Sequence, residues 1–236
     1  MQSIQTVSEN TIYVGASDRR LAKFENLFPI PRGVSYNAYV ILDEKTALLD
    51  TADASVGAQF LENVAAALDG RKLDYLIVDH MEPDHAAMIE AVLVRWPDLR
   101  LVVNAKTLPM LKMYFPTDSA AIDDALVVKE GDTLDLGKHK LTFVMAPMVH
   151  WPEVMMTFDT TTGTLFSADA FGTFGALEGA LFADEVDFAG KWLDDARRYY
   201  TNIVGKYGVQ VQAVLKKAAT LSICLLYTSD AADDRI

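Results

Sequence analysis

The sequence predicts an α/β fold in which two sheets pack face to face with helices on the outside, an αββα sandwich. Two observations support this fold class. In the first half, strand-like apolar segments alternate with helical ones, and after about residue 125 short apolar strands follow one another with turns between them. The chain has 236 residues, of which 51% are hydrophobic, so it is long and apolar enough to bury a sizeable core.

The first half contains strands and helices that can be told apart by their apolar spacing. Residues 37–51 predict two apolar strands around a turn at Asp43, Glu44 and Lys45. Helical segments show apolar residues three and four apart and end at Gly70 or before Pro97. After the hairpin, the expected elements are a helix over 55–70, a strand over 73–79, a helix over 86–96, a strand over 99–105 and a helix over 106–115.

The second half is expected to be mostly antiparallel strands. Gly131, Gly137 and Gly163 mark turns between them. The strand-like segments are "ALVVKE", "DTLDLG", "HKLTFVMAP", "VMMTFDT" and "GTLFSAD". A long helix over about 189–204 follows, and its aromatic residues are expected to serve packing: Trp192, Tyr199 and Tyr200. Neither an internal repeat nor a linker is visible, so residues 1–221 are expected to form one domain.

The last stretch, "SICLLYTSDAADDRI" over 222–236, has no periodicity of helix or strand. It resembles translated adapter sequence at the end of an assembled gene fragment. We therefore expect residues 222–236 to be a non-native tail without a fold of its own.

Charge and cysteine content exclude several functions. The formal net charge of −12 argues against binding to nucleic-acid phosphates or to a membrane surface. No apolar run approaches a membrane span, and the N-terminus shows no signal peptide, so a cytoplasmic location is expected. The single cysteine, Cys224, excludes an internal disulfide framework and an all-thiolate metal site. Any metal here must be held by imidazole and carboxylate.

The stretch "DHMEPDHAAMIEAV" over 79–92 carries groups able to bind a metal. Five of them fall within seven residues: Asp79, His80, Glu82, Asp84 and His85. In extended chain, His80 and Glu82 point to the same side, and Pro83 keeps Glu82 extended. Asp84 is expected to cap the helix over 86–96, with His85 in its first turn. Each of these residues alone is more often a cap or a solvated surface residue, but their combination after a buried strand favours a metal site.

A second cluster of candidates lies further along the chain. His150 falls in a turn between two apolar strands, held between Pro147 and Pro152 as an imidazole ligand should be. Asp169 ends an apolar strand among small residues, and its two oxygens could bridge two metals. Taken alone, His150 would more often be a core or edge histidine hydrogen-bonded to the backbone, and Asp169 would more often be a capping residue. His139 lies between two lysines at a hairpin turn, and we expect it to be exposed and not a ligand.

These residues are similar to the ligand set of the metallo-β-lactamase superfamily, whose usual motif is His-x-His-x-Asp-His. Here Glu82 replaces the second histidine. Together with "HWP" at 150 and "SADAFG" at 167, this resembles the diiron domain of the flavodiiron proteins over residues 10 to 221. The resemblance implies a metallo-β-lactamase-like sandwich that reduces O2 to water or NO to N2O. It implies that His80, Glu82 and His150 hold one iron, that Asp84 and His85 hold the second, and that Asp169 bridges them.

The resemblance also implies cofactors and partners. In the family, electrons reach the two irons through FMN in a flavodoxin-like domain, from a donor such as rubredoxin or a reductase. The family assembles as head-to-tail homodimers and has one further histidine ligand, expected near residue 229 here. No histidine follows His150, and no flavodoxin-like segment is present. By this resemblance, the chain is expected to be a fragment of a longer protein and inactive alone.

Two other functions stay open at this stage. A zinc hydrolase of the same fold would cleave a thioester, phosphodiester or lactam with metal-bound hydroxide. A metal-free interaction domain would carry an acidic loop that only resembles a site. Glu82 is the discriminating residue, because carboxylates supply the hard oxygen donors that suit iron. O2 and NO share the same ligands, so both remain expected substrates.

Overall fold

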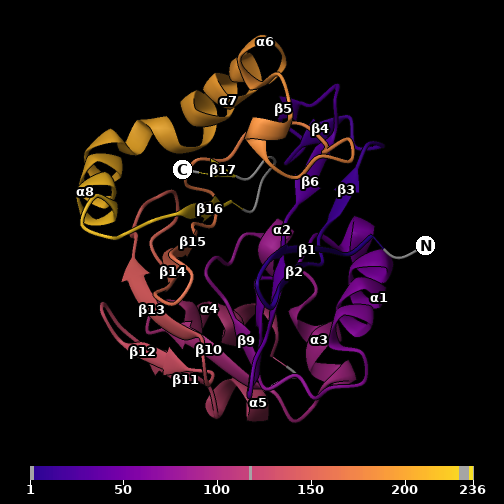
Figure 1. The fold of residues 1–236 in the computed structure, drawn as a ribbon, viewed down its shortest axis with the longest axis vertical. Coiled ribbons are helices and arrows are strands. Elements are labelled where there is room, and N and C mark those ends of the chain that lie inside the picture. The colour runs from indigo at the N-terminus through magenta and orange to yellow at the C-terminus, as the bar shows by residue number, and fades with distance from the viewer. Residues whose placement is uncertain (1–2, 117–118, 229–233, 236) are drawn as a thin grey trace.

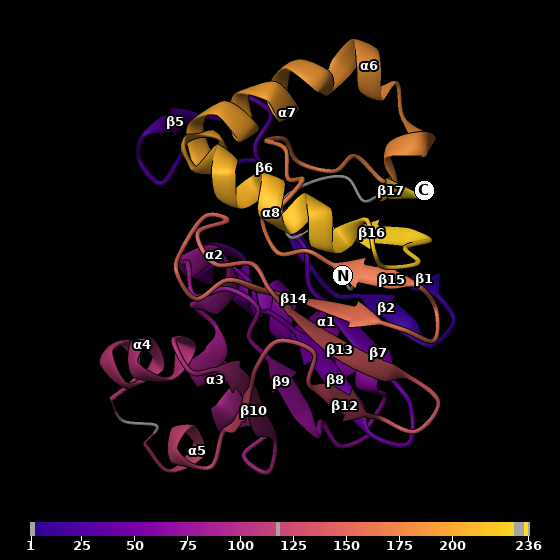
Figure 2. The same ribbon diagram turned by 90° about the vertical axis from the view of Figure 1, so that its left-hand side faces the viewer.

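The computed structural model describes residues 3–116, 119–228 and 234–235. Two sheets pack face to face, with helices on the outside (Figures 1 and 2). One sheet has seven strands in the order β1-β2-β7-β8-β9-β10-β11, and the other has six in the order β12-β13-β14-β15-β16-β17. The expected αββα sandwich is therefore confirmed.

The seven-stranded sheet contains the hairpin and the parallel strands expected from the first half. Its strands are β1 (Gln5–Ser8), β2 (Thr11–Tyr13), β7 (Tyr39–Leu42), β8 (Thr46–Leu49), β9 (Tyr75–Ile77), β10 (Arg100–Asn104) and β11 (Leu126–Val128). β7 and β8 pair antiparallel, whereas β8, β9, β10 and β11 run parallel. Parallel neighbours need crossover connections, and helices supply them. These helices are η1 (Ala54–Val56), α1 (Gly57–Leu68), α2 (Pro83–Ala86), α3 (Ile89–Arg95), α4 (Thr107–Tyr114) and α5 (Ser119–Asp123).

The six-stranded sheet is antiparallel except where β15 meets β16. Its strands are β12 (Thr133–Asp135), β13 (Lys140–Met145), β14 (Met155–Asp159), β15 (Thr164–Phe166), β16 (Leu225–Tyr227) and β17 (Asp234–Arg235). The apolar side chains between the two sheets include Ile41, Phe143 and Met155, all fully buried.

Part of the stretch over 222–236, which was expected to be a tail without a fold of its own, forms strands within the described residues. β16 lies beside β15, and the Tyr227 ring is buried and stacks on Tyr39 of the other sheet with ring centroids 4.8 Å apart. The position near residue 229, where the further histidine was expected, lies outside the described residues.

The C-terminal helices cover one side of the six-stranded sheet (Figure 1). The helix expected over 189–204 is present as three successive segments, α6 (Phe188–Lys191), α7 (Leu193–Tyr199) and η3 (Tyr200–Val204), with Trp192 between the first two. Two further helices, η4 (Gly205–Tyr207) and α8 (Gly208–Ala218), follow without having been expected. Trp192 and Tyr199 are buried, but Tyr200 is 47% exposed, so the expectation that it serves packing is wrong.

Short strands near the N-terminus complete the fold. β3 (Ala16–Asp18) pairs with β6 (Val34–Tyr36), and β4 (Lys23–Phe24) pairs with β5 (Phe28–Pro29). A short helix, η2 (Ala183–Glu185), precedes the C-terminal helices. Within the described part of the chain, no helix is long and apolar enough to cross a bilayer.

Candidate metal centre

The first ligand-bearing loop follows β9 and leads into α2. Glu82 has φ −60° and ψ 146°, which confirms that Pro83 holds it in the extended region. The helix begins at Pro83 itself, because proline suits the first helical position. The expectation that Asp84 caps a helix from 86 is therefore wrong. Asp84 lies in the first turn of α2, and its Oδ2 lies 3.6 Å from His85 Nε2.

Six side chains from three loops converge at one edge of the sandwich. His150, between β13 and β14, places Nε2 2.8 Å from Glu82 Oε2 and 3.0 Å from Asp169 Oδ2. Asp169, after β15, places Oδ1 2.6 Å from His85 Nε2. His80 Nε2 lies 3.3 Å from Glu82 Oε2 and 3.5 Å from Asp169 Oδ2. The structure thus brings together all of the predicted site residues: His80, Glu82, Asp84, His85, His150 and Asp169.

The six residues form two overlapping groups. We call the group of His80, Glu82, His150 and Asp169 site 1, and the group of Asp84, His85 and Asp169 site 2. Within each group, the atoms able to bind a metal all lie within 4.8 Å of one another, and every member is buried. Asp169 belongs to both, with Oδ1 toward His85 and Oδ2 toward the other two histidines. This is the arrangement of a carboxylate able to bridge two cations.

The donor set fits metal ions of the borderline and hard classes. Three imidazole nitrogens and three carboxylates meet in a small buried volume, where uncompensated carboxylates are costly. A fourth carboxyl, that of Glu25, faces Glu82 from the surface. The hydrogen bond to Glu82, together with burial and the negative charge of Glu82, raises the pKa of Glu25 to about 8. A bound cation would offset the electrostatic repulsion between these acidic groups.

The electrostatics of the metal-free cluster follow from its ion pairs. Burial alone would lower the pKa of His150, but the Asp169 and Glu82 carboxylates raise it to about 10. The pKa of His85 is also raised despite burial, mainly by the negative charges of Asp169 and Asp84. Burial would raise the pKa of Asp169, yet the neighbouring histidines hold it well below its usual range. Protonated imidazoles therefore neutralise the carboxylates, and bound metal ions would take the place of these protons.

Two further carboxylates support the histidines and were missed from the sequence. Glu153 Oε1 lies 2.8 Å from His80 Nδ1, and Asp50 Oδ2 lies 3.1 Å from His85 Nδ1. Burial would raise the pKa of Glu153, but its hydrogen bond with His80 lowers it, so the group is ionised. Their position in the sequence gave a weak signal: Asp50 directly follows β8, and Glu153 comes three residues after His150. Acidic residues at strand ends are too common to single these out.

Asp79, the fifth metal-binding type of side chain in the first loop, belongs to neither site. Its Oδ1 accepts a hydrogen bond from the Thr157 hydroxyl at 2.9 Å. Burial, and next the charge of Asp50, raises the pKa of Asp79 well above its usual range. This carboxyl ties the loop to β14 behind the two sites.

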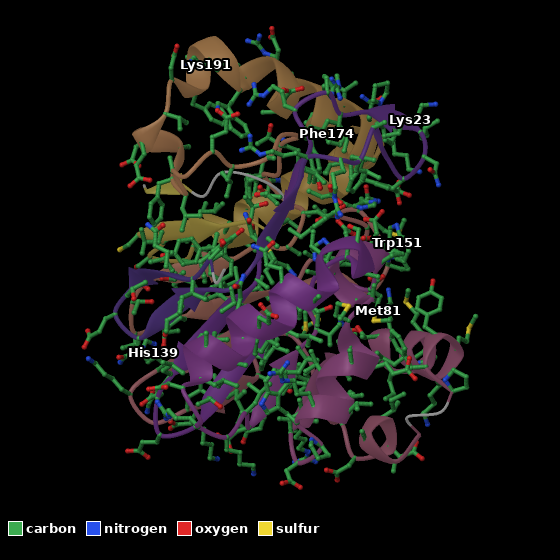
Figure 3. The ribbon with its side chains drawn as sticks, turned by 90° about the vertical axis from the view of Figure 1, so that its right-hand side faces the viewer. Lys23, Met81, His139, Trp151, Phe174 and Lys191 are labelled. Atoms are coloured by element: carbon green, nitrogen blue, oxygen red, sulfur yellow. The ribbon has the colours of Figure 1, made fainter. Side chains whose placement is uncertain are left out.

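His139 is buried, so the expectation that it is exposed is wrong. Its Nδ1 lies 2.7 Å from Asp159 Oδ2, and its backbone N–H donates to Asp43 Oδ2 at 2.6 Å. The hairpin turn is covered because it packs against the β7–β8 turn. Figure 3 shows His139 far from Trp151 and Met81, which mark the metal centre. Among the described residues, His139 belongs to no cluster of metal-binding groups.

A cavity of about 270 Å³ opens beside both sites. Glu82 and Asp84 line it together with Glu25, Asp53 and Tyr36. Small polar molecules can approach the two carboxylates from this side. The cavity leaves room for a substrate of a few atoms next to the cluster.

Comparison with known proteins places this geometry in a family. The ODP family beta lactamase profile matches residues 34–220. The chain is 34% identical over 219 residues to the anaerobic nitric oxide reductase flavorubredoxin of Aliivibrio salmonicida, covering 92% of this chain and 43% of that protein. It is 34% identical over 221 residues to the nitric oxide reductase of Moorella thermoacetica, covering 93% of this chain and 54% of that protein. The chain thus spans about half the length of the curated relatives it matches.

Solved structures agree with the sequence comparison. The flavodiiron protein from Giardia intestinalis superimposes with a TM-score of 0.92 at 26% identity, covering 100% of this chain and 56% of that one. The rubredoxin oxygen:oxidoreductase of Desulfovibrio gigas gives a TM-score of 0.91 at 28% identity, covering 99% of this chain and 57% of that one. With the family profile and the relatives, these likenesses show that the chain belongs to the ODP family of β-lactamase-like domains and is the metallo-β-lactamase-like domain of a flavodiiron protein.

Proposed function

We propose that this chain is the catalytic diiron domain of a reductase that converts NO to N2O, O2 to water, or both. The observation that carries the proposal is the pair of overlapping ligand groups that share Asp169. In this proposal site 1 holds one iron, site 2 holds the second, and Asp169 bridges them. The relatives named for nitric oxide reduction and for oxygen reduction support the reaction class.

Iron rather than zinc is the proposed metal because of the carboxylates. Glu82, Asp84 and Asp169 supply hard oxygen donors and negative charge, which stabilise Fe²⁺ and Fe³⁺. A zinc site would be richer in imidazole. The zinc hydrolase alternative would use the same fold with a histidine in place of Glu82. The identity of the bound metal therefore separates the two functions.

The residues of this chain would hold the metals, limit their coordination and exclude bulk water. When bound, the two irons supply the electrons and the open coordination positions for a small diatomic gas. Asp50 and Glu153 hold the rings of His85 and His80, so that each Nε2 faces its site. The cavity beside Glu82 and Asp84 gives the gas a way in and the product a way out.

The same proposal includes partners that lie outside this chain. The electrons would reach the irons from FMN, supplied in turn by rubredoxin or a reductase, and the whole protein would assemble as a homodimer. The similar protein of Desulfovibrio gigas is a rubredoxin oxygen:oxidoreductase, which supports rubredoxin as the type of electron donor.

Metal loading followed by a single turnover tests the function. The chain is incubated without oxygen with equal Fe²⁺ and Zn²⁺, freed of excess metal and analysed for both. We expect about two irons per chain, as the two ligand groups require. After anaerobic NO addition, the two electrons held by two Fe²⁺ ions would convert two NO and two protons to one N2O and one water, so up to one N2O per chain is expected.

The Asp169→Asn variant serves as the control, because it removes the shared ligand and should yield no N2O. Stoichiometric zinc without iron would instead favour the hydrolase. A chain that binds neither metal would support the metal-free interaction domain.

A further inference from the structure

Glu153 connects the two loops that carry the site 1 ligands. It lies in the loop between β13 and β14, three residues after His150, and the residue is 1% exposed. Its Oε1 lies 2.8 Å from His80 Nδ1 and accepts a hydrogen bond from the backbone N–H of Met81 at 3.0 Å. One carboxylate oxygen therefore holds both the ring of His80 and the peptide that follows it.

The loop around Glu153 is itself held in place from two sides. The side-chain amide of Asn104, at the end of β10, donates to the Glu153 carbonyl oxygen at 2.5 Å. The Met155 N–H donates to the Asp79 carbonyl oxygen at 3.0 Å, so the two loops also share a backbone hydrogen bond. These contacts tie the loop that carries the Glu153 carboxylate to β10 and to the loop after β9, so its position is fixed.

Trp151 restrains the same histidine ring from another direction. Its ring meets the His80 ring edge-on, with centroids 5.3 Å apart and planes at 86°. The indole thus limits rotation of the imidazole, while the carboxylate fixes which ring nitrogen carries the proton. With Nδ1–H donating to Glu153, Nε2 is the ring nitrogen left to bind a metal, and it faces Glu82 and Asp169.

We propose that Glu153 is a positioning residue of site 1. The metal affinity of site 1 depends on Glu153, whereas the metal affinity of site 2 does not. Oε1 holds the Met81 N–H as well, so the peptide between His80 and Glu82 is fixed together with the His80 ring. Loss of the carboxylate releases two of the four site 1 ligands at once. Site 2 keeps its own support, since Asp50 holds His85 independently. This inference rests on the proposed metal assignment.

The experiment measures metal binding at site 1 in the 236-residue chain. Asp84→Asn is introduced first to weaken site 2, and the resulting protein is titrated with Co²⁺ against a competing chelator. Glu153→Gln and Glu153→Ala are then made in that background. Because partners of metal-bound histidines typically contribute 10- to 100-fold in affinity, we expect the Gln variant to lose about 10-fold and the Ala variant about 100-fold. The visible Co²⁺ spectrum should also change, because the ring orientation changes.

Asp159→Asn in the same background is the matched control. Asp159 also binds a buried histidine through a short contact, 2.7 Å to His139 Nδ1, but away from both sites. It should lower the melting temperature of the metal-free protein and leave the Co²⁺ affinity and spectrum unchanged.

The outcomes separate this inference from the proposed function. Wild-type Co²⁺ affinity in both Glu153 variants would overturn the positioning role, and so would an equal loss of affinity in Asp159→Asn. A wild-type chain that binds no metal would overturn the metal assignment itself. If Glu153→Ala fails to fold, the isosteric Gln variant still decides, because it fills the same space but removes the negative charge that faces His80, and wild-type Co²⁺ affinity in it would overturn the positioning role.

Discussion

Two buried histidine–carboxylate pairs in this protein have nearly the same geometry but different surroundings. His80 Nδ1 lies 2.8 Å from Glu153, and His139 Nδ1 lies 2.7 Å from Asp159. The Nε2 of His80 faces two more carboxylates, Glu82 and Asp169, whereas the Nε2 of His139 has no hydrogen-bond partner among the described residues. Burial and a carboxylate partner therefore do not by themselves make a histidine a candidate metal ligand. What makes one is the set of groups that the second ring nitrogen meets.

Removing the shared ligand should have the largest effect on the metal centre. Asp169→Asn leaves a single amide oxygen, so the residue can no longer offer an oxygen to each site, and it removes a negative charge that lies 2.6 Å from His85 Nε2 and 3.0 Å from His150 Nε2. We expect the metal content to fall from about two per chain to near zero, a loss of affinity well beyond the 10- to 100-fold typical of supporting residues. Elemental analysis after dialysis measures it. Retention of two metals would show that Asp169 does not bridge.

Changing the metal preference should have the next largest effect. Glu82→His restores the usual histidine of the superfamily and replaces an oxygen donor of site 1 with nitrogen. After loading with equal Fe²⁺ and Zn²⁺, the ratio of zinc to iron should rise by an order of magnitude or more. Glu82→Gln, which removes the charge without adding an imidazole, is the control and should weaken binding of both metals. An unchanged ratio in Glu82→His would show that Glu82 does not set the preference.

Proton competition should give a smaller, graded effect. The folded-state pKa of His150 is about 10, above its ordinary 6.5, so its ion-pair stabilisation is complete below 6.5 and is lost as the pH rises through about 10. The metal-free protein should therefore lose stability over that range. Metal affinity should rise over the same range, because the metal needs the unprotonated ring.

Urea unfolding and Co²⁺ titration at several pH values measure the two trends. His150→Gln is the control for the first, since the metal-free variant should lose less stability between pH 6.5 and 10. A metal affinity that falls with rising pH would contradict the assignment of His150 as a ligand.

The pair outside the metal centre should give the smallest effect on metal binding and a clear effect on stability. Asp159→Asn weakens the buried contact with His139, and leaving a buried polar group without its partner costs about 1–3 kcal/mol in the free energy of unfolding. Metal content should not change. Chemical unfolding of the metal-free and loaded variant measures both, and a loss of metal would mean that the hairpin end and the metal centre are coupled.

Sequence reasoning succeeded where local geometry decides. His80, Glu82 and His85 follow a buried strand at fixed spacing, and Pro83 holds Glu82 extended whatever the rest of the chain does. It failed for the capping role of Asp84, because proline at the first helical position moved the start of α2 ahead of the expected cap. His150 and Asp169 were ambiguous as single residues, and their pairing came from the resemblance and not from their own spacing.

The sequence by itself determined the sandwich, the succession of strands along the chain between residues 37 and 169, and the six side chains of ligand type. These follow from short-range periodicity, turn residues and chain stiffness. Only the tertiary structure decided that His139 is buried, that Glu153 and Asp50 hold two ligand rings, and that residues 225–227 form a strand beside β15. The physical reason is that burial and hydrogen-bond partners depend on segments far apart in the chain. His80 and Glu153 are 73 residues apart, and no local pattern records that they meet.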